Sequence, residues 1–105
     1  FFMCLFCQII NGEQESEKLY EDEKCVVIKD KFPSSSFHVL VIPKNHIDSI
    51  STIEETDLEI ISHLVWVAKK IAEQNNLKGY KLLWNVNKEG GQVIFHIHLH
   101  VMADV

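Results

Sequence analysis

Three histidines recur at every second position near the C-terminal end of the chain, in the segment GGQVIFHIHLH (90–100). Successive side chains of a β-strand point to opposite faces, so His96, His98 and His100 should share one face. The aliphatic residues that alternate with them should pack beneath the sheet: Ile97, Leu99 and Val101. A solvated histidine face is the alternative, but three imidazoles with no Lys, Glu, Ser or Thr among them indicate a chemical site.

A metal site that uses all three imidazoles is a second alternative. Successive residues on one face of a strand are roughly 6.6 Å apart, so His96 and His100 should be separated by roughly 13 Å. Two neighbouring imidazoles can reach one ion, whereas three from one flat strand can hardly do so. The spacing therefore favours a division of labour among the three side chains.

The glycine-rich segment NKEGGQ (87–92) leads into the histidines. Glycines expose backbone N–H groups and let a phosphate approach closely, so such a loop is a candidate anion site. A neutral imidazole, whose unperturbed pKa is about 6.5, is a nucleophile toward phosphorus near neutral pH. The combination predicts phosphoryl or nucleotidyl transfer through a covalent phosphohistidine, with a neighbouring protonated imidazole stabilising the phosphate oxygens.

The rest of the chain predicts the elements that position this site. Strands are expected at 18–23, 24–30, 37–46 (stopped by Pro43), 79–86 and 93–103, and one or two helical turns at 7–13. The long helix is expected at 51–76, begun by a capping box of Ser51 and Glu54. Its apolar residues recur at steps of three and four: Leu58, Ile61, Leu64, Val65, Ala68, Ile71 and Ala72. The pattern predicts an α+β fold with a mainly antiparallel five-stranded sheet and its helices on one face.

Length and composition set the class of protein. With 105 residues, 47% of them hydrophobic, the chain is expected to form one domain over 1–105. The net charge of −5 argues against an extended nucleic-acid interface, and no run is long enough to span a membrane. The three cysteines suggest thiols or metal ligands in a cytoplasmic protein, with the nucleus as a second compartment. Phe1 and Phe2, ahead of Met3, are expected to be a cloning remnant.

The His-x-His-x-His motif followed by apolar residues resembles the signature of the histidine triad (HIT) superfamily. The likeness extends through LFCQIINGE, YEDEKCVVIKD, FHVLVIPKNHI, the long helix and WNVNKEGGQ, and the segment GGQVIFHIHLH is most similar to the Hint branch of purine nucleoside phosphoramidases. The resemblance implies the HIT fold and a homodimer in which the two sheets join. In that dimer Trp66 would lie in the subunit contact, and residues 80–86 would pair with the partner.

The resemblance also implies an activity that needs no cofactor: hydrolysis of purine nucleoside phosphoramidates or aminoacyl adenylates to AMP or GMP. His98 would attack the α-phosphorus and form a nucleotidyl intermediate, while His100 and His38 would polarise the phosphate and handle protons. The implied nucleotide-binding residues are Asp30 for the ribose, and Asn85 with the backbone amides of Gly91 and Val93 for the phosphate. Gln92 would also bind the nucleotide, and the purine slot would be lined by Leu5, Phe6, Ile9 and Ile28.

A structural zinc site is implied by the Cys-x-x-Cys segment near the N-terminus. Similar members bind zinc with these thiols, a histidine after Ile-Pro-Lys and the first histidine of the triad. The corresponding residues are Cys4, Cys7, His46 and His96, a tetrahedral donor set. Two buried thiols without metal are the alternative. Cys25 is expected in the core.

The chain departs from the family at three places. Val93 stands where many relatives have Ser or Thr, which predicts a slower or altered activity. Lys31 occupies a position near the base that is often apolar, and EQES (13–16) replaces a more usual Ile-Pro stretch. Two other functions stay open: a dinucleoside polyphosphate hydrolase of the Fhit type, and a nucleotide- or zinc-binding interaction module with weak catalysis.

Overall fold

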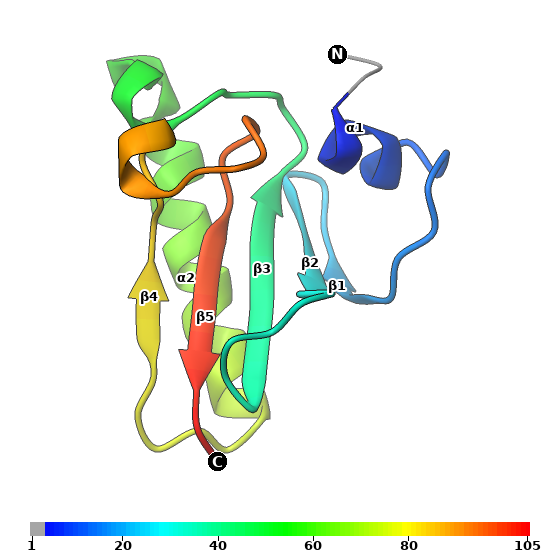
Figure 1. The fold of residues 1–105 in the computed structure, drawn as a ribbon, viewed down its shortest axis with the longest axis vertical. Coiled ribbons are helices and arrows are strands. Elements are labelled where there is room, and N and C mark those ends of the chain that lie inside the picture. The colour runs from blue at the N-terminus through cyan, green and yellow to red at the C-terminus, as the bar shows by residue number, and fades with distance from the viewer. Residues whose placement is uncertain (1–3) are drawn as a thin grey trace.

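The fold is a five-stranded antiparallel sheet with helices on both faces (Figure 1). The computed structural model describes residues 4–105, so the expected remnant at Phe1 and Phe2 lies outside the described residues. The strand order is β1-β2-β3-β5-β4. The strands are β1 (Lys18–Glu21), β2 (Cys25–Lys29), β3 (Phe37–Pro43), β4 (Lys81–Leu83) and β5 (Leu99–Ala103). The helices are α1 (Leu5–Ile10) and α2 (Leu58–Gln74), with short 3₁₀ turns η1 (Ile50–Thr52), η2 (Glu55–Asp57) and η3 (Lys88–Gly90). The predicted α+β fold with a five-stranded antiparallel sheet is confirmed.

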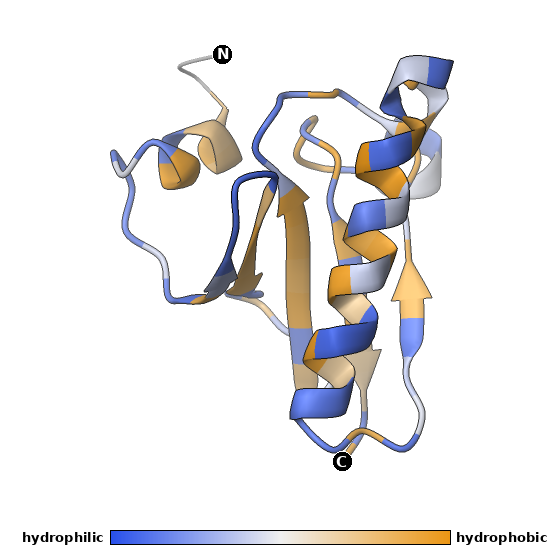
Figure 2. Ribbon diagram, turned by 180° about the vertical axis from the view of Figure 1, so that it is seen from behind, coloured by the Kyte–Doolittle hydropathy of each residue, from blue (hydrophilic) through white to orange (hydrophobic). Residues whose placement is uncertain are grey.

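Helix α2 covers one face of the sheet, the face that Figure 2 shows toward the viewer. The buried residues of this layer are Cys25, Val27, Val39, Val41, Leu64, Val67, Ala68, Ile71, Leu99 and Val101. Ile97 is also buried, so the three aliphatic residues between and after the histidines pack inward as predicted. Burying one such side chain contributes about 1.5–3 kcal/mol to folding. This layer therefore fixes β5 so that His100 faces the other side of the sheet.

Helix α1 packs on the opposite face from α2. Its residues Phe6 and Ile9 pack on the strand residues that point away from α2: Val26, Ile28, Leu40 and Ile42. The prediction that the helices share one face is therefore wrong. The reason lies in β2 and β3, which are apolar without alternation and buried along almost their whole length. A strand of this kind needs cover on both faces.

Helix α2 begins at Leu58 rather than at Ser51. The predicted capping box is wrong, because η1 and η2 occupy this segment and the N–H of Glu54 donates to Asp57 Oδ2 (2.9 Å). Leu58 and Val65 are exposed, so these two predicted residues do not face the sheet. The face toward the sheet consists of the buried residues Leu64, Val67, Ala68, Ile71 and Ala72, with Ile60 and the predicted Ile61 partly buried against the same core. Within residues 4–105 no helix has the length and apolar character needed to cross a membrane.

Asp22 ties the turn between β1 and β2 to α2. Its Oδ1 accepts the backbone N–H groups of Lys24 and Cys25 (2.7 and 2.8 Å), and its Oδ2 accepts from Tyr20 Oη and His63 Nε2 (2.9 and 2.7 Å). Partial burial opposes ionisation, but these hydrogen bonds outweigh it and hold the pKa of Asp22 well below its usual range. The turn is thus held in place, and Cys25 is fully buried in the core as predicted.

Candidate functional site

A cavity of about 420 Å³ opens on the face of the sheet that carries α1. Its volume is typical of small-molecule sites. The apolar part of its wall is formed by Leu5, Phe6, Ile9, Ile28, Leu40 and Ile94, and the polar part includes Gln14, Ser16, Lys29, Asp30, Lys31, Asn85, His98 and His100. Two ammonium groups, Lys29 and Lys31, and the carboxylate of Asp30 line the cavity, and Lys29 is ion-paired with Glu17 (3.4 Å). The cavity therefore suits a ligand with an apolar part and a polar part.

The histidine segment enters the site as an irregular chain and becomes a strand only at its end. The sequence predicted a strand from residue 93, but β5 begins at Leu99, so two of the three histidines precede it. The N–H of Ile97 donates to the carbonyl of Ile47 (2.7 Å), which lies in the loop after β3. The segment 93–98 is therefore hydrogen-bonded to a loop and not to a neighbouring strand.

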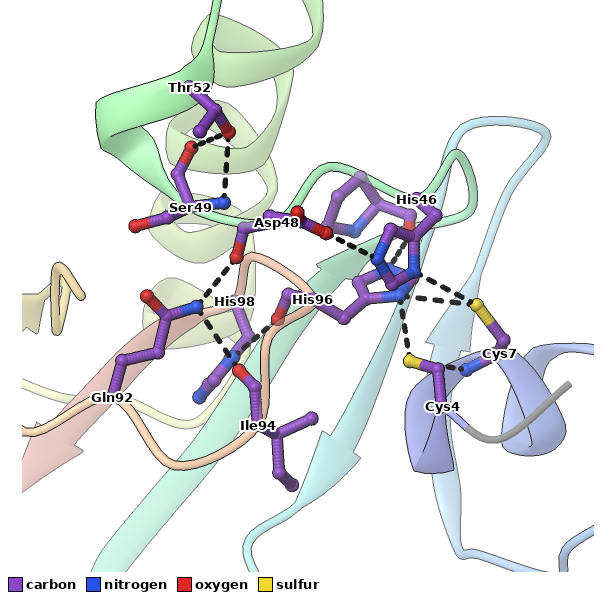
Figure 3. A network of polar contacts seen from close by, with 11 residues as sticks. Cys4, Cys7, His46, Asp48, Ser49, Thr52, Gln92, Ile94, His96 and His98 are labelled. Carbon is purple, nitrogen blue, oxygen red and sulfur yellow. Dashed lines mark hydrogen bonds and ion pairs between the residues drawn. The ribbon is translucent and has the colours of Figure 1, made fainter. Parts of the chain in front are cut away.

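Gln92 holds the glycine-rich loop in place. Its Nε2 donates to the carbonyls of Asp48 and Ile94 (2.6 and 3.1 Å), and its Oε1 accepts the N–H of Asn87 (2.9 Å); Figure 3 shows the first two bonds. Gln92 is buried and is not part of the cavity wall. Its side chain thus binds backbone groups and does not face a ligand, contrary to its predicted contact with the nucleotide.

His98 lines the cavity, and one of its two ring nitrogens is unprotonated. Its Nδ1 lies 2.8 Å from the carbonyl oxygen of His96, which can only accept, so Nδ1 must hold the proton and Nε2 is bare (Figure 3). Burial lowers the pKa of His98, so the ring is neutral at pH 7. The ring of Phe6 packs edge-on at 4.9 Å between centroids and fixes its orientation. His98 is therefore a ready nucleophile.

His38 and His100 form a hydrogen-bonded pair behind His98. The N–H of Ser34 donates to His38 Nδ1 (3.1 Å), so the proton of His38 is on Nε2, which lies 2.8 Å from His100 Nδ1 and 3.2 Å from Asp30 Oδ2. His100 therefore carries its own proton on Nε2, a buried atom with no hydrogen-bond partner among residues 4–105. Burial, together with the charges of His98 and His38, lowers the pKa of His100 to about 4. An unpaired N–H beside the nucleophile is an available donor for an anion.

The glycine-rich loop contributes Asn85, Gly91 and Val93 to the cavity wall. Asn85 Nδ2 donates to the carbonyl of Gly90 (2.9 Å), and Gly91 has φ +88°, in the left-handed region that favours glycine. The N–H of Gly91 donates to the carbonyl of Lys88 (3.0 Å). The amide of Gly91 is engaged in the turn η3 in this structure, and its contact with a phosphate stays a prediction. Val93 is 87% exposed at the mouth of the cavity.

Four side chains next to the cavity form a cluster with the ligand atoms of a metal site. The Sγ atoms of Cys4 and Cys7 and the Nδ1 atoms of His46 and His96 all lie within 4.8 Å of one another. Cys7 Sγ is 3.2 Å from His46 Nδ1 and 3.5 Å from His96 Nδ1, and Cys4 Sγ is 3.4 Å from His96 Nδ1. With ligand bonds of about 2.1–2.3 Å, the corners of a tetrahedral zinc site are about 3.6 Å apart. The donor set and its spacing both fit zinc.

The second nitrogen of each cluster histidine is held by an acceptor. His96 Nε2 donates to the carbonyl of Pro43, and His46 Nε2 donates to Asp48 Oδ1, both at 2.8 Å. The Nδ1 lone pairs of His46 and His96 therefore point toward the thiols, which is the orientation that coordination of a metal through Nδ1 requires. Burial and the neighbouring thiol of Cys4 raise the pKa of Cys7 to about 11, so a cation would have to displace a proton there.

His96 belongs to both sites. Its ring is part of the cluster, while its carbonyl accepts the Nδ1–H of His98 (Figure 3). Phe6 contacts both rings, with centroid distances of 5.9 Å to His96 and 4.9 Å to His98. The predicted division of labour therefore agrees with the geometry: the first histidine lies in the cluster, and the second and third line the cavity.

The structure places most of the predicted site residues together. Of the predicted base-binding residues, Phe6, Ile9 and Ile28 are buried and Leu5 is half-exposed, and all four line the cavity. The sequence analysis missed further wall residues: Gln14, Ser16, Lys29, Phe32, Leu40 and Ile94. The unusual EQES stretch was the only signal for two of them, Gln14 and Ser16.

Comparisons with known proteins agree with this geometry. A family profile described as "Scavenger mRNA decapping enzyme C-term binding" matches residues 3–105. An "Uncharacterized HIT-like protein" of Chlamydia muridarum is 37% identical over 100 residues, which cover 94% of this chain and 79% of the relative. "Protein HitA" of Neisseria gonorrhoeae is 36% identical over 101 residues, covering 95% of this chain and 94% of the relative.

Solved structures of histidine triad proteins share the fold at high similarity. A HIT family hydrolase from Clostridium thermocellum has a TM-score of 0.96 at 39% identity, covering 100% of this chain and 93% of its own. A HIT family hydrolase from Legionella pneumophila has a TM-score of 0.93 at 39% identity, covering 95% and 91%. A zinc-bound histidine triad protein from Mycobacterium smegmatis has a TM-score of 0.87 at 31% identity, covering 99% and 76%. The chain, with its His-x-His-x-His motif and hydrolase relatives, therefore belongs to the histidine triad (HIT) superfamily.

Proposed function

We propose that this protein hydrolyses purine nucleoside phosphoramidates or aminoacyl adenylates to a nucleoside monophosphate, as in the Hint branch. One observation supports the proposal above all others. The Nδ1–H of His98 is held by the carbonyl of His96, which leaves a bare Nε2 on a ring that lines the cavity, beside the Nε2–H of His100, which has no hydrogen-bond partner among residues 4–105. This pairing of a nucleophile with an anion donor suits displacement at phosphorus.

In the first step, the Nε2 lone pair of His98 forms a bond to the α-phosphorus, and the bond from phosphorus to the leaving group breaks. A carboxylate leaves without a proton, and an amine takes one from water at the open mouth of the cavity. The positive charge on His98 is stabilised by the carbonyl that accepts its Nδ1–H, while His100 donates to a phosphate oxygen. In the second step, water attacks phosphorus as the bond to His98 breaks, which restores the neutral ring. The proton that this water loses passes to the solvent, where it neutralises the hydroxide formed when an amine leaves.

A histidine substitution tests this mechanism. His98→Ala should lower kcat/KM for adenosine or guanosine phosphoramidate by at least about 10⁴-fold, as expected for loss of a covalent nucleophile, while AMP still binds. His63→Gln is the matched control, because His63 lies on α2 and bonds Asp22 outside the cavity. Turnover that survives in the His98 variant would remove the nucleophile assignment. Faster cleavage of diadenosine polyphosphate than of phosphoramidate would favour the Fhit-type alternative.

We also propose that the cluster of Cys4, Cys7, His46 and His96 holds a structural zinc ion. The spacing of the ligand atoms and the zinc-bound relative support this assignment. When bound, zinc would crosslink the start of α1 to the loop after β3 and to the histidine segment. Elemental analysis of protein purified without added metal should give one zinc per chain, and Cys25→Ala should not change it because Cys25 lies in the other core.

A homodimer through the β4 edge is the third part of the proposal. Among residues 4–105, β4 is an outer strand that pairs only with β5, and its Leu82 and Leu83 are exposed. Trp66 on α2 is 55% exposed, with Lys69 Nζ 5.3 Å from its ring centroid. Light scattering should give the mass of two chains for the wild type and of one chain for Trp66→Glu.

A further inference from the structure

Asp30 is the only carboxylate among the described residues that line the cavity, and backbone contacts fix its position. Its N–H donates to the carbonyl of His38 (3.1 Å), which extends the pairing of β2 with β3 by one step. Its Oδ1 accepts the N–H of Phe32 (2.9 Å), as an Asp side chain in a turn commonly does. The second oxygen, Oδ2, lies 3.2 Å from Nε2 of the His38 ring. With Oδ1 held by the turn, Oδ2 stays beside this nitrogen.

The proton of His38 depends on the groups at its two ring nitrogens. A carboxylate can only accept, so Oδ2 of Asp30 favours the tautomer that has its proton on Nε2. The N–H of Ser34, 3.1 Å from Nδ1, favours the same tautomer from the other side of the ring. The side chain of His38 is 4% exposed and that of Asp30 is 19% exposed, so water screens their interaction little. The carboxylate is the stronger of the two determinants, because an ionised group acts on an N–H more strongly than a neutral one.

The tautomer of His38 decides what His100 offers to a phosphate. With its proton on Nε2, His38 donates to His100 Nδ1 (2.8 Å), and His100 keeps its own proton on Nε2, where it can be donated. In the opposite arrangement, His100 Nδ1 would donate to His38, and His100 Nε2 would turn a lone pair toward the phosphate and repel it. Asp30 therefore acts on His100 through His38.

We propose that Asp30 is a positioning residue for the pair of His38 and His100, in addition to its predicted contact with the ribose. Its carboxylate keeps the proton of His38 on Nε2, and this keeps His100 a donor to the phosphate. The kinetic part of this inference rests on the proposed function, whereas the part on proton positions rests only on the contacts of Asp30, Ser34, His38 and His100.

Asp30→Asn tests the proton positions directly. The amide oxygen should take the place of Oδ1, because only the oxygen can accept the N–H of Phe32. The amide nitrogen then replaces Oδ2 and turns a donor toward His38 Nε2, so the proton of His100 should move from Nε2 to Nδ1. Long-range ¹H–¹⁵N NMR of the full chain measures this change without turnover. Asp30→Ala adds no donor, so the N–H of Ser34 should keep the wild-type tautomer in most molecules.

Two substrates separate this role from ribose binding. The 2′,3′-dideoxy analogue of adenosine phosphoramidate has no ribose hydroxyl for Asp30 to hold, so a loss of turnover with it has another cause. Asp30→Asn should lower kcat for both substrates by about 100-fold, as expected when one donor to the developing charge is lost, and Asp30→Ala should lower it less. Glu73→Gln is the matched control: it removes a carboxylate that is ion-paired with Lys69 on α2, outside the cavity, and should leave kcat unchanged.

The other results contradict the proposal at defined points. A loss in Asp30→Asn that appears only in KM, and only with the substrate that has ribose hydroxyls, would overturn it and leave the proposed function intact. A proton that stays on Nε2 of His100 in this variant would also overturn it, as would equal losses of kcat in Asp30→Asn and Asp30→Ala. If the wild type turns over neither substrate, the proposed function fails, and NMR alone decides the part on proton positions.

Discussion

Acidification gives the most direct test of the nucleophile. The pKa of His98 is lowered by burial, and those of His96 and His100 are lowered to about 4 for the same reason. An imidazole of unperturbed pKa 6.5 would be only about 10% neutral at pH 5.5, whereas the lowered pKa of His98 keeps a larger fraction of its ring neutral at that pH. Because the neutral form of His98 is the reactive one, kcat/KM should fall between pH 7.5 and 5.5 by much less than the tenfold expected for an exposed histidine.

The assay combines kinetics with a direct view of the rings. The pH profile of kcat/KM for a nucleoside phosphoramidate gives the apparent pKa of the free enzyme, and long-range ¹H–¹⁵N NMR gives the tautomer and pKa of His98 independently of turnover. Circular dichroism at pH 5.5 should show an intact fold, since the pKa of Asp22 lies far lower. A rate that halves near pH 6.5, or a His98 ring whose proton is on Nε2, would refute the reasoning.

Further substitutions test the elements around the nucleophile. Cys7→Ser should release the proposed zinc and lower both Tm and the affinity for GMP, because α1 carries Cys7 together with the wall residues Phe6 and Ile9 and follows directly on Cys4; unchanged metal content and an unchanged Tm would contradict this. Asp22→Asn should lower the free energy of unfolding by about 2 kcal/mol in urea titrations, since an amide cannot accept from all four donors; Tyr20→Phe should cost about half as much, and equal losses would speak against the network. The Asp22 contribution is present above the unfolded pKa of about 3.9 and is lost as the pH falls below it. Val93→Ser should raise kcat/KM for phosphoramidates severalfold if the missing hydroxyl limits the rate, and an unchanged value would assign Val93 no part in catalysis.

The sequence predicted the main features of the sheet because these depend on local patterns. The apolar runs of β2 and β3 and the three- and four-residue steps of α2 are visible without any knowledge of contacts. The same holds for the left-handed residue Gly12, which closes the turn after α1 (φ +78°). The errors lie where contacts with residues distant in the sequence determine the local structure. β5 begins late because the loops around Gln92 and Ile47 supply the hydrogen bonds that a strand would have made.

The site residues were predicted through a resemblance, and the structure adds what spacing alone does not contain. The proton positions of His38 and His100 follow from the N–H of Ser34, and the use of Gly91 by its own turn follows from η3. Neither contact has a sequence signal. The homodimer and the cytoplasmic location stay predictions, because they depend on molecules outside one chain.

The double use of His96 has a consequence for inhibition of the enzyme. A reagent that alkylates Cys4 or Cys7 would act at atoms outside the cavity wall. It would displace the carbonyl of His96, which fixes the proton of His98 on Nδ1, and the helix that carries Phe6. Such a compound would lower the activity without occupying the nucleotide site.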